Sequence, residues 1–223
     1  MIRDALSGTF ELPVYFDYPA TFIWALSGAV LAARLRMDPT GVALIALVTA
    51  AGGGLLRDGL FLQIGPPALI RTPVYLILIG IAVVTVILAG ARVLHFRHFD
   101  QIVVLIDLFG LGTYAIVGLE LSLSVGLSVL AAIFVGTVNA VGGGLLRDII
   151  LRRTPELLQP GSPITIVAIT GCVAYAVMTR LFGLPGGLAG LSAIFLVLFI
   201  RTMALRLGLR TAAIRGFPQA DDE

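Results

Sequence analysis

A seven-residue string that occurs twice constrains the fold of this chain more than any other feature. The first copy, residues 52–58, reads Gly-Gly-Gly-Leu-Leu-Arg-Asp, and residues 142–148 repeat it without a change, 90 positions later. The same displacement, without gaps, aligns Asp17 with Asp107. Seven consecutive identities are very improbable by chance, so we predict two homologous halves that each contain one copy.

The composition indicates the environment in which these halves fold. Of the 223 residues, 58% are hydrophobic and only 13% are charged, against roughly 25% charged in soluble proteins. The mean hydropathy is +1.04. A water-soluble chain of this kind would expose large apolar patches and aggregate. We therefore exclude a disordered chain, a nucleic-acid-binding module and an ordinary cytosolic enzyme. The composition predicts an all-α membrane protein with a single transmembrane domain, residues 1–223.

The apolar segments are long enough to be counted as membrane spans. A helix needs about 20 predominantly apolar residues to cross the hydrocarbon core of a bilayer. Turn-forming residues such as Asp38-Pro39 and Pro185-Gly186 separate the segments. Seven transmembrane helices are predicted, at residues 17–35, 40–61, 73–91, 102–119, 124–150, 163–179 and 188–205.

These spans divide into two repeats and a remainder. The first repeat, residues 15–92, and the second, residues 100–182, each hold three spans, and a seventh helix follows at residues 187–207. Because three is an odd number, the second repeat must enter the membrane from the side opposite to the first. The predicted architecture is therefore two inverted three-helix repeats plus a seventh helix. In many transport proteins this arrangement places the translocation pathway at the repeat interface.

Seven spans put the termini on opposite sides of the membrane, and arginine decides the orientation. All 15 basic residues are Arg, dispersed along the chain rather than gathered in a nucleic-acid-binding patch. With the N-terminus outside, 11 of them fall on the inner side and four on the outer side. Cytoplasmic loops carry an excess of basic residues. We predict a multi-pass protein of the cell (inner) membrane, with residues 208–223 as a cytoplasmic tail.

The duplicated string brings glycine and charge into spans 2 and 5. Each glycine costs about 1 kcal/mol relative to alanine in a helix, so a triplet predicts a local break or kink. The Arg57–Asp58 and Arg147–Asp148 pairs follow about one turn later. Intramembrane ionisable residues usually face a bundle interior or water, so these pairs are pore or gating candidates. The predicted kink residues are Gly52, Gly53, Gly54, Gly142, Gly143 and Gly144.

Two plainer interpretations of the string remain open. Small residues let transmembrane helices pack closely, so the glycines need not break them. The Arg-Asp pairs can also mark the ends of the spans, with each arginine reaching toward the lipid headgroups. We favour the pore interpretation because the pairs recur at the same register in both halves.

Four further polar residues match across the repeat. Asp17 and Asp107 begin spans 1 and 4, where a carboxylate stabilises a helix N-terminus. A cap is the simpler interpretation, and a place in the pathway is the alternative. Thr49 and Asn139 precede the glycine triplets by about one turn. They either line a pore or satisfy backbone groups that a break would free.

Other chemistry is not indicated by the sequence. It lacks the zinc-protease, nucleophile-elbow and phosphate-loop motifs, so we expect no enzyme activity, ATP drive or cofactor. His95 and His98 have no third ligand near them in the sequence, so no metal site is predicted. Cys172 is the only cysteine and lies in an apolar run, which favours an inert buried thiol.

The duplicated string, with Asp17 and Asp107 opening spans 1 and 4, resembles the prokaryotic trimeric intracellular cation (TRIC) channel family. The resemblance covers residues 15–207. It implies seven helices in two inverted repeats plus one, with spans 2 and 5 kinked at the glycine triplets. It also implies a homotrimer in membrane lipids, with one pore for K⁺ and Na⁺ in each protomer. Animal members use further basic residues in lipid binding and gating, and the resemblance assigns none of them to a position in this sequence.

Two other functions compete with a channel. A secondary transporter for a small polar solute would use the same repeat interface. A structural membrane protein without transport would have a dry, closed core around both triplets. Arg57 and Arg147 are unexpected in a cation pore, but the aspartate after each can neutralise it. Either arginine can also act as a gate while carboxylates and carbonyl groups favour cations.

Overall fold

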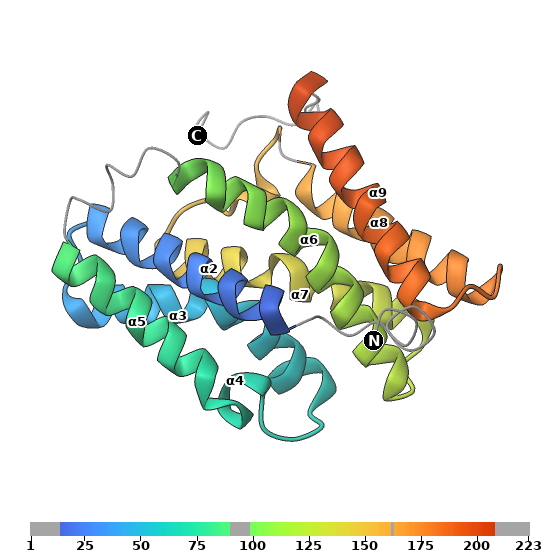
Figure 1. Cartoon of the computed structure of the whole chain (residues 1–223), viewed down its shortest axis with the longest axis horizontal. Helices are drawn as coiled ribbons and strands as arrows, with labels where there is room; N and C mark the ends of the chain where they lie inside the picture. The colour runs from blue at the N-terminus through green and yellow to red at the C-terminus, as the bar shows by residue number, and fades with distance from the viewer. Residues whose placement is uncertain (1–13, 90–98, 162, 208–223) are drawn as a thin grey trace, which may run out of the picture.

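The structure, a computed structural model of the chain, describes residues 14–89, 99–161 and 163–207. In these ranges the regular elements are all helices, as Figure 1 shows, so the predicted all-α class is confirmed. The predicted tail at residues 208–223, together with His95 and His98, lies outside the described residues.

The first half of the chain folds into helices that begin and end at recognisable signals. They are α2 (Val14–Arg34), α3 (Pro39–Leu55), the π-helix η1 (Leu56–Leu62), α4 (Ala68–Arg71) and α5 (Pro73–Ala89). Asp38 caps α3, because its carboxylate accepts a hydrogen bond from the N–H of Gly41 at 2.8 Å. Because η1 continues α3 without a gap, the two form one helical stretch of 24 residues.

The second half repeats several of these boundaries with a displacement of 90 residues. Its helices are α6 (Phe99–Ser124), α7 (Val129–Ile150), the 3₁₀ turn η3 (Glu156–Leu158), α8 (Ile164–Arg180) and α9 (Gly186–Leu207). α2 and α6 end at Arg34 and Ser124, and Ser128 replaces Asp38 as the cap that precedes the next helix. The displacement seen in the sequence therefore also relates the helix boundaries of the two halves.

Each predicted span overlaps a helix, but the predicted boundary between spans 4 and 5 is wrong, because α6 continues to Ser124 and α7 begins only at Val129. Only some of the helices are long and apolar enough to cross a membrane on that basis alone. Three described stretches qualify: Pro39–Leu62, Val129–Ile150 and Gly186–Ala204. Pro73–Ala89 and Ile164–Arg180 are apolar but shorter. The number of seven crossings therefore stays a prediction.

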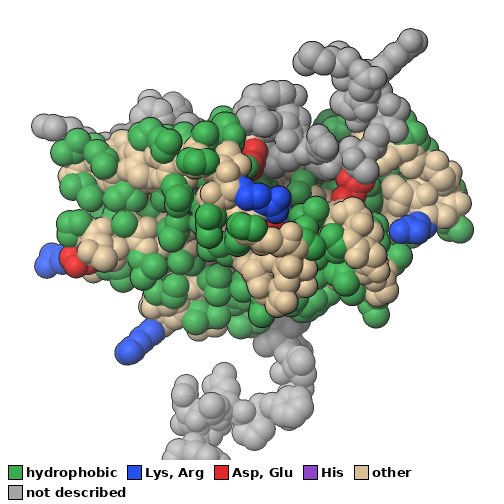
Figure 2. All heavy atoms as spheres, turned by 90° about the horizontal axis from the view of Figure 1, so that it is seen from below, with side chains coloured by type: hydrophobic (Ala, Val, Ile, Leu, Met, Phe, Trp, Pro, Cys, Tyr) green, Lys and Arg blue, Asp and Glu red, His purple; other side chains and the backbone are tan. Residues whose placement is uncertain are grey.

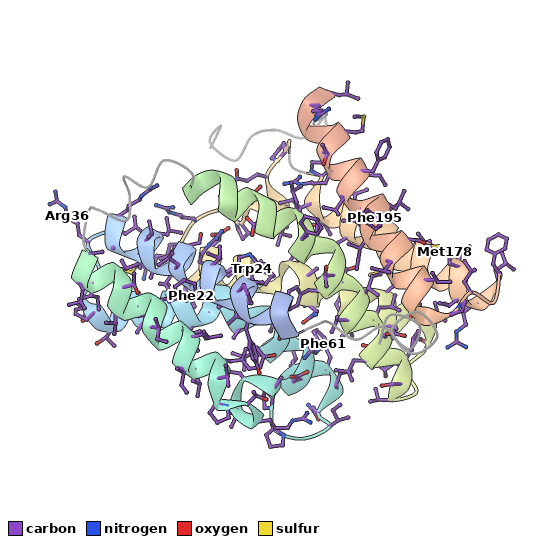
Figure 3. All side chains as sticks on the ribbon, viewed as in Figure 1. Phe22, Trp24, Arg36, Phe61, Met178 and Phe195 are labelled. Atoms are coloured by element: carbon purple, nitrogen blue, oxygen red, sulfur yellow. The ribbon has the colours of Figure 1, made fainter. Side chains whose placement is uncertain are left out.

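The surface is apolar, as a membrane protein requires. In Figure 2 hydrophobic side chains cover most of the visible described surface, and charged ones are few. Phe195 on α9 projects away from the bundle in Figure 3 and is 66% exposed. Such exposure of a large aromatic side chain is ordinary when lipid replaces water.

Each half has its own hydrophobic core. The first core joins α2, α3 and α5 and includes Ile45, and the second joins α6, α7, α8 and α9. Cys172 lies buried in the second core. The most extensive contact between the halves is that of α3 with α7, the two helices that carry the duplicated string.

Both glycine triplets lie inside continuous helices, so the predicted break is wrong. α3 passes through the first triplet, and the N–H of Leu56, two residues beyond it, donates to the carbonyl groups of Gly52 and Gly53. α7 passes through the second triplet and continues to Ile150. Close packing between α3 and α7, described below, offsets the poor helix propensity of glycine. A bend of the intact helices at these positions stays a prediction.

Candidate functional site

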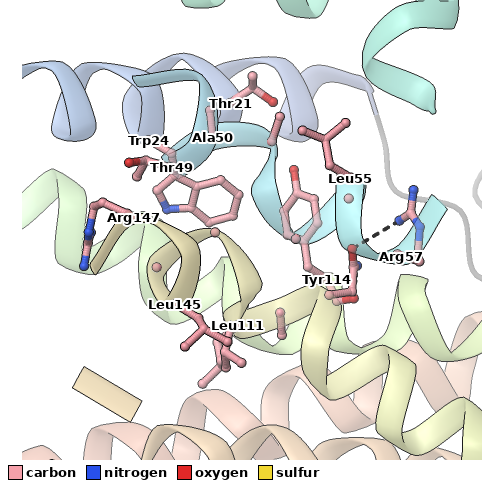
Figure 4. A pocket seen from close by; sticks show the side chains of 18 of the residues that line it. Thr21, Trp24, Thr49, Ala50, Leu55, Arg57, Leu111, Tyr114, Leu145 and Arg147 are labelled. Carbon is pink, nitrogen blue, oxygen red and sulfur yellow. Dashed lines mark hydrogen bonds between the residues drawn. The ribbon is translucent and has the colours of Figure 1, made fainter. Parts of the chain in front are cut away.

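A cavity of about 570 Å³ lies between the two halves. Helices of both halves line it, and Figure 4 shows it from close by. The structure brings together in this lining all eight polar residues that the sequence marks as pore or gating candidates. They are Asp17, Thr49, Arg57, Asp58, Asp107, Asn139, Arg147 and Asp148.

At one end of the cavity, Arg57 and Asp58 form a buried ion pair inside the π-helix η1. The Nε of Arg57 donates to Asp58 Oδ1 at 2.6 Å, and the two side chains are only 10% and 4% exposed. The second carboxylate oxygen, Asp58 Oδ2, accepts the backbone N–H of Ala68 at 3.0 Å. A buried charge needs such complete pairing to be stable. π-Helical segments are rare and frequently occur at functional sites.

Arg147 and Asp148 repeat this arrangement at the other end. Arg147 Nε donates to Asp148 Oδ1 at 2.8 Å, and the side chains are 22% and 9% exposed. Asp148 Oδ2 accepts the backbone N–H of Glu156 at 3.3 Å. Arg201 of α9 comes within 3.9 Å of the Glu156 carboxylate, which adds a second ion pair at this end. The two ends are therefore alike in their Arg-Asp pairs but not identical.

The glycine triplets allow α3 and α7 to touch backbone to backbone. A methyl group at Gly53 would lie 2.1 Å from the carbonyl oxygen of Asn139, and one at Gly143 would lie 2.5 Å from that of Thr49. At Gly54, by contrast, an added methyl group would meet no atom within 4 Å. The structure thus supports the close-packing interpretation for the first two glycines of each triplet. The third glycine of each triplet lines the cavity.

Thr49 and Asn139 occupy matching places but bond differently. The Thr49 hydroxyl donates to the carbonyl of Ile45 in its own helix at 2.6 Å. The Asn139 amide donates to the carbonyl of Tyr114 in α6 at 2.6 Å, and its Oδ1 accepts from Arg57 at 3.5 Å. Asn139 therefore links the Arg57 end of the cavity to a helix of the other half.

The helix N-terminus interpretation is wrong for Asp107, whereas Asp17 does lie at a helix N-terminus. α6 begins at Phe99, which places Asp107 about two turns inside the helix. Asp17 lies in the first turn of α2, but its carboxylate accepts hydrogen bonds from the hydroxyl groups of Tyr75 and Tyr114. Asp107 accepts instead from the indole N–H of Trp24 at 2.6 Å. Both carboxylates therefore point at aromatic donors in the cavity lining.

Among the lining residues that sequence reasoning missed, five add charge or surround the two aspartates. Glu156 and Arg201 add charge at the Arg147 end, and Trp24, Tyr75 and Tyr114 surround the two aspartates. One signal was present in the sequence, because the 90-residue displacement that aligns Asp17 with Asp107 also aligns Trp24 with Tyr114. Arg201 had no such signal, since α9 has no counterpart in the first half.

Comparison with known proteins identifies the family. The model of the family described as "Glycine transporter" matches residues 14–91 and, a second time, residues 104–180. A solved TRIC trimeric intracellular cation channel orthologue from Rhodobacter sphaeroides is 30% identical, with a TM-score of 0.73 over 88% of this chain and 98% of that one. The chain belongs to the TRIC family. The resemblance noted in the sequence is thereby confirmed.

Other relatives agree with this TRIC assignment. A second solved structure, of a TRIC cation channel, gives a TM-score of 0.78 at 27% identity over 92% of this chain and 98% of that one. The UPF0126 inner membrane protein YadS of Escherichia coli K12 is 32% identical over 200 residues, 89% of this chain and 94% of that protein. A UPF0126 membrane protein of Deinococcus radiodurans is 32% identical over 98% of this chain and 100% of its own length. The chain is therefore a multi-pass membrane protein.

The family model also bears on the internal duplication. Its two matches begin at residues 14 and 104, which is the displacement that relates the two copies of the string. Each half of this TRIC protein thus corresponds to one copy of the family model.

Proposed function

We propose that this TRIC-family protein is a monovalent cation channel whose pore runs through the cavity within each protomer. The observation that carries the proposal is the charge of the lining. Five carboxylates against three guanidinium groups give it a net charge of −2 when all are ionised, whereas the whole chain is +2. A negatively charged, low-dielectric cavity concentrates cations and repels anions. The solved relatives named as cation channels support the same conclusion.

The negative charge is shared by both ends of the proposed pore. Arg57 is neutralised by Asp58 next to it, which leaves Asp17 as the excess charge at that end. At the other end Arg147 and Arg201 are matched by Asp148 and Glu156, and Asp107 is the excess charge. A cation would therefore meet one uncompensated carboxylate on entering from either side.

The architecture that goes with this proposal is the one predicted from the sequence. Seven crossings form two inverted repeats plus α9, with the N-terminus outside and the C-terminus in the cytoplasm. Three protomers assemble in the lipid bilayer, each with its own pore for K⁺ and Na⁺. The matching helix boundaries of the two halves and the trimeric Rhodobacter relative support this arrangement.

The decisive experiment is ion flux from liposomes that contain the purified protein. We expect K⁺ and Na⁺ to pass and Cl⁻ to be excluded, with unitary current steps in planar bilayers. Chloride flux equal to that of K⁺, or no flux of either, would contradict the proposal. The cavity already argues against a purely structural role, which predicts a closed core at the triplets.

A second candidate is transport of a small zwitterion such as glycine. The family model carries the description "Glycine transporter". The Arg57–Asp58 and Arg147–Asp148 pairs offer a positive and a negative group side by side, the complement of an amino acid's carboxylate and ammonium. Inverted repeats with a central site suit alternating access.

Uptake kinetics separate the two candidates. The same liposomes are supplied with labelled glycine over a range of concentrations, with and without K⁺ and Na⁺ gradients. Saturable uptake that depends on an ion gradient, without unitary currents, would favour the transporter. Unitary K⁺ currents without glycine uptake would favour the channel.

A further inference from the structure

Two aromatic rings from equivalent places in the two halves meet inside the cavity. Trp24 of α2 and Tyr114 of α6 are related by the 90-residue displacement, and both line the cavity. Their ring centroids lie 5.0 Å apart with the planes tilted by 57°. In Figure 4 the two rings project into the cavity between Arg147 on one side and Arg57 on the other. They therefore stand between its two charged ends.

Each ring is held by the carboxylate of the opposite half. The Trp24 indole N–H donates to Asp107, and the Tyr114 hydroxyl donates to Asp17. Asp17 and Trp24 lie seven residues apart on α2, as do Asp107 and Tyr114 on α6, so each pair shares a helix face about two turns apart. The four groups therefore follow one another across the cavity in the spatial order carboxylate, ring, ring, carboxylate.

A glycine makes room for one of these rings. A methyl group at Gly110 of α6 would lie 2.2 Å from Cζ2 of the Trp24 indole and 2.6 Å from its Cη2. The indole thus packs directly against the α6 backbone, and its position depends on the absence of a side chain there. Trp24 is fixed by this contact at its six-membered ring as well as by the hydrogen bond of its N–H.

We propose that Trp24 and Tyr114 form an aromatic barrier that closes the pathway, with Asp107 and Asp17 holding it shut from opposite halves. This inference rests on the proposed transport function. The two carboxylates that attract the permeating solute also position the barrier, and because the rings brace one another, release of either ring opens the pathway.

Variants that remove one donor and keep the ring test the barrier. Trp24→Phe loses the indole N–H, and Tyr114→Phe loses the hydroxyl. A hydrogen bond to a charged group is strong enough that its loss is expected to raise K⁺ flux about tenfold in each variant. Gly110→Ala is expected to raise flux as well, by pushing the indole off α6.

A matched control exists outside the cavity. The Tyr175 hydroxyl donates to the carboxylate of Glu120, and neither residue lines the cavity. Tyr175→Phe therefore removes the same kind of hydrogen bond without touching the pathway, and its flux is expected to equal that of the natural chain. Unchanged or lower flux in both Trp24→Phe and Tyr114→Phe would overturn the barrier. A rise in only one of the two would overturn the claim that both halves hold it.

A readout independent of transport is provided by the single tryptophan of the chain. Because Trp24 is the only tryptophan, fluorescence emission reports on the barrier alone. Asp107→Ala and Gly110→Ala are expected to shift its emission to the red and to remove its shielding from acrylamide, whereas Tyr175→Phe is not. If the natural chain passes no K⁺, the proposal of a channel is wrong. The fluorescence measurement still tests whether Asp107 and Gly110 hold Trp24 in the barrier. Emission and quenching unchanged in both cavity variants would overturn the barrier.

Discussion

Single residues show how charge is kept inside an apolar bundle. In each copy of the string the arginine donates to the aspartate that follows it, and the second carboxylate oxygen accepts the backbone N–H of the first residue of the next short helix, α4 or η3. Asp58 and Asp148 thereby serve two partners at once. This local neutralisation lets a guanidinium group line a cation pathway without reversing its charge.

Removing an arginine should therefore make the pathway more negative. We expect Arg57→Gln and Arg147→Gln to alter single-channel conductance or gating, because each leaves its aspartate without a counter-charge. Recordings in planar bilayers measure this directly. Arg180→Gln is the control, since Arg180 is exposed at the end of α8 and does not line the cavity. Unchanged currents in both cavity variants would contradict the assignment.

Removing an aspartate should cost stability as well, because it leaves a buried arginine without its counter-charge. Asp58→Ala strands a buried guanidinium group, and we expect a loss of about 3 kcal/mol. Asp148→Ala should cost less, because the Arg147 side chain is 22% exposed against 10% for Arg57. Thermal unfolding in detergent measures both losses. The double variant Arg57→Gln/Asp58→Asn should recover most of the loss, and equal losses for the two single variants would contradict the explanation.

At the scale of elements, the crossing of α3 and α7 decides how the halves meet. Small residues permit such close approach between membrane helices. The two helices differ beyond the crossing, since α3 passes into the π-helix η1 and α7 stays α-helical to Ile150. The same seven-residue string therefore ends in a π-helix in the first half and in an α-helix in the second. The residues that follow differ, with Gly59 in the first half where the second has Ile149.

Alanine substitutions should separate the packed glycines from the open ones. Gly53→Ala and Gly143→Ala push the helices apart, and we expect a loss of about 1–3 kcal/mol from overpacking. Gly54→Ala meets no atom within 4 Å and should be neutral or stabilise the helix by up to about 1 kcal/mol. Thermal unfolding in detergent, with the oligomeric state checked by size exclusion, makes the comparison. Equal effects at Gly53 and Gly54 would show that helix propensity, not packing, governs the triplet.

At the scale of the whole molecule, two similar halves enclose the cavity. They are not equivalent, because α9 has no counterpart in the first half. α9 packs on α6 and α8 and sends Arg201 to the Arg147 end. The two directions through the cavity are consequently unlike. The proposed inverted arrangement of the halves, combined with the arginine distribution, predicts which end faces the cytoplasm.

The orientation can be checked without a purified protein. We expect a fluorescent protein fused after Glu223 to fluoresce in cells, because it folds in the cytoplasm, and an alkaline phosphatase fusion at the same place to be inactive. The positive-inside distribution of arginine is the physical reason. The reverse pattern of the two reporters would invert the orientation and exchange the two ends of the pathway.

The features that depend on hydropathy and on the 90-residue repeat could be predicted from the sequence. Helix positions followed from apolar run lengths and breakers, and the eight polar candidates followed from residues matched across the repeat. The cap interpretation failed for Asp107 because α6 begins at Phe99, before the apolar run itself, whereas Asp17 lies in the first turn of α2 as expected. The predicted break failed because propensity is a local quantity, whereas the contact of Gly53 with Asn139 is a tertiary one. Hydrogen-bond partners such as Trp24 and Asp107, which lie 83 residues apart, could be identified only from the three-dimensional structure.

The crossing of α3 and α7 also makes the two copies of the string a single mutational target. Gly52 faces Gly143, and Gly142 faces Gly53, so the first two glycines of each copy are the surface against which those of the other copy pack. A mutation at one of these glycines is thus also a mutation in the binding partner of the other half.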